Sequence, residues 1–207
     1  MDTKKLTLTI VFATLAIVLN PSLTYISLPY PLMPALVYQL WEIPIVIAFL
    51  IISPIVGIAV ALLNTSVLFV LFPGALPTGP LYNLLATLFM QIGIYAAITI
   101  SKKVTGYKTP QTNSHTSIKW LLTATGLGAL TRVAFMTVIL YFALPQTPPI
   151  GYAFDQTATN AFLPLAALFN ATLALYTIPT SWIIGQRIQK VLHLNIPKTI
   201  GTGKIKS

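Results

Sequence analysis

The sequence predicts an all-α membrane protein with six transmembrane helices, both termini in the cytoplasm, and a long outer loop after the first helix. The composition, the lengths of the apolar segments and the placement of lysine and arginine support this class. Only 7% of the 207 residues are charged, 56% are hydrophobic, and the mean hydropathy is +0.82. A soluble domain has about 25% charged residues and needs them to cover its surface. The composition therefore excludes soluble enzymes and soluble nucleic-acid-binding proteins.

The apolar segments are long enough to cross a bilayer, whose hydrocarbon core, about 30 Å thick, requires about 20 helical residues. They lie at about 6–20, 35–72, 81–101, 117–144 and 158–187. The second is too long for one helix, and Ser53-Pro54 interrupts it shortly before Gly57. Proline removes a backbone donor and disfavours helix at the preceding residue, so we expect a break there. Dividing the segment at this point predicts six spans.

The basic residues test this division. Apart from Arg132, every lysine and arginine lies before residue 6, between 102 and 119, or from 187 onward. The intervening segments 21–40, 73–80 and 145–157 contain none. Six spans place all basic segments on one side, which the positive-inside rule assigns to the cytoplasm. We therefore expect a single six-helix domain over residues 1–190 and a basic cytoplasmic tail over 191–207. A cleaved signal peptide is the alternative for the first helix, but no clear cleavage site follows it.

The segment after the first helix is unusually rich in proline and aromatic residues. Residues 20–44 contain five prolines together with Tyr25, Tyr30, Tyr38 and Trp41. Proline restricts the loop, and aromatic rings offer flat surface, so the segment is expected to form a stiff lid over a pocket. An interfacial aromatic belt is the alternative interpretation.

Residue patterns typical of catalysis are missing. The chain has no cysteine, and neither of its two histidines belongs to a metal-ligand spacing. The three acidic residues, Asp2, Glu42 and Asp155, are far apart in sequence, and no phosphate-binding Walker A loop is present. We therefore expect no metal, no cofactor and no enzymatic activity. The alternative is a membrane enzyme that uses Glu42 and Arg132 on a lipid or a small metabolite.

Polar residues inside the apolar segments are the strongest indication of a binding site, because each is costly in hydrocarbon. Arg132 lies within the fifth predicted helix. It is expected either to bind an acidic or carbonyl group of a substrate or to form a buried ion pair with Glu42. Side-chain amides suit a polar heterocycle, although they also serve as bonds between helices. The predicted site has Tyr38, Gln39, Trp41 and Glu42 near its mouth, and Asn64, Asn83, Arg132 and Asn170 inside.

Segment 38–44 reads YQLWEIP and segment 53–57 reads SPIVG. These segments are similar to parts of the substrate-binding S component of energy-coupling factor (ECF) vitamin transporters. They resemble the acidic entry to the second helix and the Gly-Pro-x-x-Gly turn before the third, with Ser53 replacing the usual glycine. Segments 132–137 (RVAFMT) and 140–142 (LYF) are similar to the fifth helix of the riboflavin-type branch. The Phe-Asn pair at 169–170 also resembles that branch, whereas Asn64, Leu140 and Thr172 depart from it.

The resemblance implies a chain in the cytoplasmic membrane of a prokaryote that captures a vitamin or vitamin-like molecule from outside. It also implies partners, namely a transmembrane coupling subunit and two cytoplasmic ATPase subunits whose ATP hydrolysis drives release inward. The docking surface would be the face of the first helix around Thr9, Ala13 and Ala16. These residues are small, and small residues let helices approach closely, although they serve contacts within a chain as well. A structural membrane subunit without a cavity is a further alternative.

Overall fold

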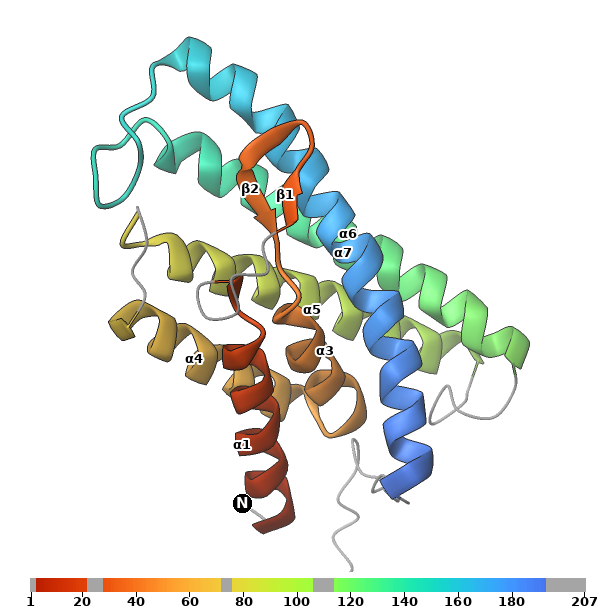
Figure 1. The fold of residues 1–207 in the computed structure, drawn as a ribbon. Coiled ribbons are helices and arrows are strands. Elements are labelled where there is room, and N and C mark those ends of the chain that lie inside the picture. Colours follow the sequence, from red (N-terminus) through yellow and green to blue (C-terminus); the bar gives the residue numbers. More distant parts are fainter. Residues whose placement is uncertain (1–2, 22–27, 72–75, 106–113, 193–207) are drawn as a thin grey trace, which may run out of the picture.

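A computed structural model describes residues 3–21, 28–71, 76–105 and 114–192 (Figure 1). The chain is mostly helical. Its elements, in chain order, are α1 (Thr3–Val18), β1 (Leu28–Tyr30), β2 (Met33–Tyr38), α3 (Glu42–Ile51), α4 (Pro54–Leu71), α5 (Gly79–Thr105), α6 (Ser114–Ala143) and α7 (Gln156–Leu192).

The long helices agree with the predicted spans. In the described part of the chain, α4, α5, α6 and α7 are long and apolar enough to cross a membrane. The apolar helices α1 and α3 are shorter, and α3 has 10 residues, or about 15 Å, which is about half of a bilayer core. The expected break at Ser53-Pro54 is confirmed, since α3 ends at Ile51 and α4 begins at Pro54. The six-span topology and its orientation remain predictions.

The segment expected to be a long loop contains a β-hairpin, so the expectation of an all-α fold is wrong there. Strands β1 and β2 pair antiparallel, with Leu28 opposite Tyr38 and Tyr30 opposite Met33. A two-stranded hairpin is barely stable alone and needs a surface to pack against. Here Tyr30 and Tyr38 both contact Phe169 of α7, with ring centroids 5.4 and 5.6 Å apart. Sequence patterns did not show this support, because it comes from a helix more than 130 residues away.

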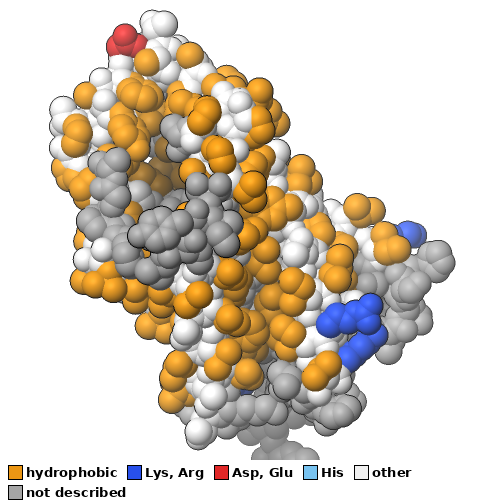
Figure 2. Space-filling model, viewed as in Figure 1, with side chains coloured by type: hydrophobic (Ala, Val, Ile, Leu, Met, Phe, Trp, Pro, Cys, Tyr) orange, Lys and Arg blue, Asp and Glu red, His pale blue; other side chains and the backbone are white. Residues whose placement is uncertain are grey.

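The two ends of the bundle differ in character. Figure 1 shows the start of α1, the end of α5, the start of α6 and the end of α7 at the lower and right side, and the hairpin and the α6–α7 connection at the opposite end. On the face drawn in Figure 2, the basic side chains gather at the lower right and the acidic one lies at the top. This distribution agrees with the charge pattern of the sequence.

Close helix contacts build the core. Gly57 of α4 lies against the backbone of Phe49 in α3, so an added Cβ would collide with it. This approach lets the chain reverse direction within two residues after Ile51. Helix α1 then packs on α3 and α4, with Phe12, Ala13 and Ala16 buried in one cluster with Trp41 and other residues of α3 and α4.

The predicted docking residues are therefore not on the surface. The exposed fractions are 3% for Thr9, 5% for Ala13 and 0% for Ala16. Their small side chains serve the contact of α1 with the rest of this chain, and the expectation that they form a docking surface is corrected accordingly. The exposed apolar side chains of α1 include Leu6 and Ile10, which lie on its other side.

Candidate functional site

A cavity of about 310 Å³ lies at the end of the bundle that holds the hairpin. Its walls come from β2, α5, α6, α7 and the segment 144–155 that joins α6 to α7. Most of the lining side chains are apolar, among them Leu36, Met136, Phe162 and Phe169. The polar ones are Gln39, Tyr82, Asn83, Arg132, Tyr152 and Asn170. An apolar hollow with a few polar groups is the usual form of a small-molecule site.

Arg132 of α6 forms a buried ion pair with Glu42, the first residue of α3. Nη1 lies 2.5 Å from Oε2 of Glu42, and Nη2 lies 2.9 Å from Oε1. The exposed fractions are 1% for Arg132 and 0% for Glu42. Such a two-point pair is strong because both carboxylate oxygens accept hydrogen bonds from the planar guanidinium. Of the two predictions for Arg132, the ion pair is the one observed.

Two further groups complete the surroundings of the guanidinium. Nε of Arg132 donates to Oδ1 of Asn170 at 2.9 Å, and Nη1 also approaches the sulfur of Met90 at 3.7 Å. Nδ2 of Asn170 donates in turn to the carbonyl of Ala166. The network joins α3, α5, α6 and α7 at the inner end of the cavity. Among the described residues that line the cavity, only Arg132 carries a charge, and Glu42 balances it.

Gln39 and Asn83 form a neutral polar edge on the cavity wall. Nε2 of Gln39 donates to Oδ1 of Asn83 at 3.2 Å, whereas the buried Oε1 of Gln39 has no hydrogen-bond partner in the described part of the chain. The hydroxyl of Tyr176 accepts from the backbone N–H of Gln39 and donates to its carbonyl, which holds this residue in place. A buried acceptor without a partner costs free energy, so a bound molecule with a matching donor would be stabilised here.

The structure divides the predicted site residues into two groups. Gln39, Asn83, Arg132 and Asn170 line the cavity together. The others are absent from its lining and lie elsewhere: Tyr38 in the aromatic contacts with Phe169, Trp41 in the core, Glu42 behind Arg132, and Asn64 in the interior of α4.

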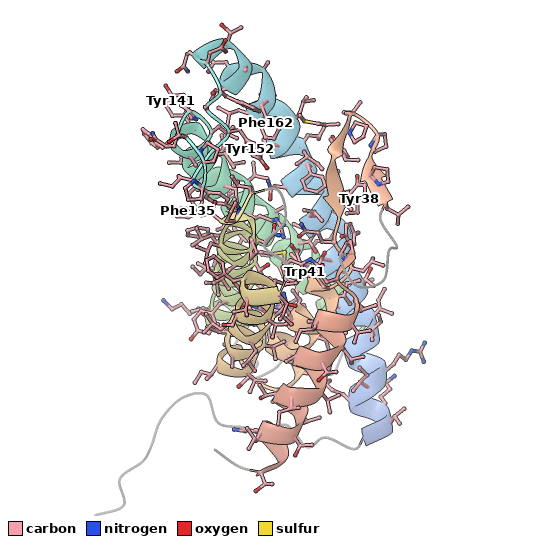
Figure 3. The ribbon with its side chains drawn as sticks, turned by 60° about the vertical axis from the view of Figure 1, so that its left-hand side comes forward. Tyr38, Trp41, Phe135, Tyr141, Tyr152 and Phe162 are labelled. Carbon is pink, nitrogen blue, oxygen red and sulfur yellow. The ribbon has the colours of Figure 1, made fainter. Side chains whose placement is uncertain are left out.

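Two of these residues, Trp41 and Asn64, are buried in the interior of the bundle. Trp41 is 1% exposed and belongs to a buried cluster with residues of α1, α3 and α4, and Figure 3 shows it deeper in the bundle than Tyr38. Asn64 is 0% exposed, and both of its amide atoms lack partners among the described residues. The expectations that Trp41 lies at the mouth and that Asn64 lies in the pocket are therefore corrected.

The segment between α6 and α7 forms a wall of the cavity that sequence analysis did not assign to the site. It contributes Ile150, Gly151 and Tyr152 to the lining, and its Phe154 contacts both Tyr152 and Phe162 of α7, with ring centroids 5.6 and 5.9 Å apart. The hydroxyl of Tyr82 donates to the carbonyl of Ile150 at 2.6 Å. Thr78 donates likewise to the carbonyl of Pro149, so the start of α5 holds the segment over the cavity. The only sequence signal was the cluster of prolines and aromatic residues near position 150.

Replacing Tyr82 by Phe is expected to loosen this segment. A single hydrogen bond contributes about 0.5–1.5 kcal/mol, so local opening should become roughly 2- to 13-fold more frequent. The opening is measured by hydrogen exchange of the backbone amides of Tyr152 and Phe154. Both amides donate to the carbonyl of Leu144. The control is Tyr95→Phe, since Tyr95 is 45% exposed on the same helix. Equal exchange in both variants would contradict the role of Tyr82.

Together, these observations describe a helical bundle with four described helices that are long and apolar enough to cross a membrane and with a cavity at one end. The chain matches no family model and no curated protein. Among solved structures, it is similar to the S component of a bacterial ECF transporter, with a TM-score of 0.67 and 23% sequence identity. The match covers 93% of this chain and 99% of the other. The two proteins thus share a fold over nearly their whole lengths.

Proposed function

We propose that this chain is the substrate-binding S component of an ECF-type importer in the cytoplasmic membrane of a prokaryote. The observation that carries the proposal is the 310 Å³ cavity, which combines apolar walls with an unpartnered buried acceptor on Gln39. The shared fold with a bacterial S component supports the same assignment. In this proposal, the cavity faces outward and captures a solute for release into the cytoplasm.

The chemistry of the cavity favours a small, flat heterocycle of vitamin type. Its volume is at the lower end of the roughly 300–1,000 Å³ that is typical of ligand sites. Phe162, Phe169 and Tyr152 supply aromatic surface, and the amides of Gln39 and Asn83 supply an acceptor and a donor side by side. Riboflavin is the first candidate, because segments 132–142 and 169–170 resemble the riboflavin-type branch. Other heterocyclic micronutrients have the same features.

Import would require partners that supply energy, since the chain has no nucleotide-binding motif. We propose a transmembrane coupling subunit and two cytoplasmic ATPase subunits. Expression of the tagged chain with such subunits should yield a complex that survives purification in detergent, and uptake into cells should stop when the ATPases are inactivated. Uptake that is independent of the ATPases would contradict this part of the proposal.

The alternative of a membrane enzyme finds no support in the geometry. Acid–base chemistry by Glu42 would require its carboxyl group to face a water-filled cleft. Both of its oxygens instead accept hydrogen bonds from Arg132, and the residue is 0% exposed. The alternative of a structural subunit would suit a closed interior, whereas this bundle contains a cavity.

Mass spectrometry of small molecules that co-purify with the detergent-extracted protein tests the proposed function most directly. It is combined with calorimetric binding measurements on a panel of vitamins, riboflavin first. We expect at least one compound to bind with a dissociation constant between nanomolar and micromolar values. No co-purified solute and no binding across the panel would overturn the proposal.

Gln39→Leu is expected to weaken binding of the best compound of that panel by about 10-fold or more, because a buried hydrogen bond from the solute would be lost. The melting temperature should change little, since the loss of the hydrogen bond to Asn83 is offset by the removal of a buried acceptor that lacks a partner. Gln156→Leu is the matched control, because Gln156 is exposed at the start of α7, outside the cavity lining. Equal affinities of the two variants would exclude Gln39 from the site.

A further inference from the structure

The charge of the cavity depends on a residue that does not line it. Arg132 reaches the cavity wall, whereas Glu42 lies behind it and is absent from the lining. Of the two paired residues, only Arg132 is among the residues that line the cavity. A solute in the cavity would therefore meet Arg132 and not Glu42.

The position of Glu42 is secured from both sides along the chain. On one side, the hydroxyl of Tyr176 binds both backbone groups of Gln39. On the other, Ser181 donates to the carbonyl of Ile43 at 3.2 Å. Both anchoring side chains belong to α7, so the start of α3 is fixed to that helix. The carboxylate is thus held against Arg132 by the surrounding fold as well as by its own charge.

The ion pair has a consequence for which solutes can enter. A lone guanidinium in an apolar cavity would attract anions strongly, because the local dielectric constant is low. With Glu42 bound at two points, the charge is balanced, and an anionic solute would lose its hydration without gaining a counter-charge. Among the described residues, no other charged side chain lines the cavity, and Asp155 caps the start of α7 through the N–H of Ala158.

We propose that Glu42 sets the charge selectivity of the cavity: by neutralising Arg132, it makes the site favour uncharged solutes over carboxylates and phosphates. The inference rests on the proposed function, since it takes the cavity as the solute site. Glu42 acts through Arg132 and touches no solute, so it is a positioning residue. Removing its charge should convert the site into one that attracts anions.

The absence of cysteine allows a test that needs no known ligand. A cysteine is introduced by Ala166→Cys in the full chain, where Ala166 lines the cavity one turn from Asn170. Its reaction rate is measured with a neutral reagent, methyl methanethiosulfonate, and with the anionic sulfonatoethyl methanethiosulfonate. The ratio of the two rates reports the charge that a solute meets. The same ratio at Gln156→Cys, on the exposed start of α7, serves as the reference.

Adding Glu42→Gln should raise the anionic-to-neutral ratio at position 166 by about tenfold or more, because the charge on Arg132 is no longer balanced. The ratio at position 156 should stay the same. Adding Arg132→Gln to Glu42→Gln should return the ratio at 166 to its original value, since the double variant is again neutral. A merely structural role for Glu42 would not produce this reversal. An unchanged ratio in Glu42→Gln would overturn the proposal.

If Glu42→Gln does not fold, the variant Ala166→Cys alone provides a second test. Relative to position 156, the anionic reagent and the cationic trimethylammonioethyl methanethiosulfonate should differ by less than about tenfold in rate. A larger preference for the anionic reagent would show that Arg132 acts as a free cation, which would overturn the inference while leaving a solute site in place. No reaction with the neutral reagent would instead mean that solutes do not reach the cavity, and the proposed function would fail with it.

Discussion

Arg132→Met is expected to lower the free energy of unfolding of the detergent-purified protein by about 3–5 kcal/mol, because it leaves a buried charge without its partner. The unpaired group is the carboxylate of Glu42, whose exposed fraction is 0%. Asn170 loses a donor as well, because its Oδ1 accepts from Nε of Arg132. Thermal unfolding, monitored by circular dichroism, measures the loss as a lower melting temperature.

Two variants show whether the unpaired charge is the cause. The double variant Glu42→Met/Arg132→Met removes both charges and should recover most of the lost stability, since replacing a buried pair by apolar residues is often neutral. Lys119→Met is the matched control, because it removes an exposed positive charge from the same helix, α6. Its effect should stay within about 0.5 kcal/mol. If the double variant were as unstable as Arg132→Met, the unpaired charge would not be the cause of the loss. The fold would then require the ion pair itself.

Gly151→Ala is expected to displace the segment 144–155 and to weaken binding of the best solute by about 50-fold or more, because the contacts of that segment with the solute would be lost. A methyl group at this position would collide with the backbone carbonyl oxygens of Ala143, Leu144 and Gln146. Backbone atoms cannot rotate aside as the end of a side chain can, so the segment itself must move.

The effect is measured by calorimetry and, independently of any ligand, by hydrogen exchange. The amide of Ala153 donates to the carbonyl of Gln146 and should exchange faster once the segment moves. Gly79→Ala is the control, since Gly79 also lines the cavity but has open space where a methyl group would lie. If the Gly151 variant kept its affinity and its slow exchange, the segment would not form the cavity wall.

Much of the architecture was predictable from local sequence features. Apolar length predicted the long helices, and Pro54 predicted the break between α3 and α4. The cost of an arginine in hydrocarbon pointed to Arg132, and Glu42 was named as one of its two possible partners. These predictions succeeded because they depend on properties of one segment at a time, namely hydropathy, proline geometry and the desolvation of a charge.

Local sequence features did not predict which face of a helix is buried in the core. In a membrane, both the lipid-facing and the core-facing sides of a helix are apolar, so hydropathy does not distinguish them. Thr9, Ala13 and Ala16 therefore fitted a docking surface as well as a core contact, and the structure shows the core contact. Trp41 fitted a pocket mouth for the same reason and is buried in a cluster with residues of α1, α3 and α4.

The composition and segment lengths by themselves determined that the chain is a helical membrane protein with polar residues held inside it. Only the tertiary structure decided which of those residues share a cavity. Gln39 and Asn83 are 44 positions apart, and Arg132 and Glu42 are 90 apart. Such pairs form only after separate helices pack, and the register of that packing depends on close contacts such as that of Gly57 with Phe49. The physical reason is that burial, and with it the choice of hydrogen-bond partner, is a property of the assembled bundle and not of any one segment.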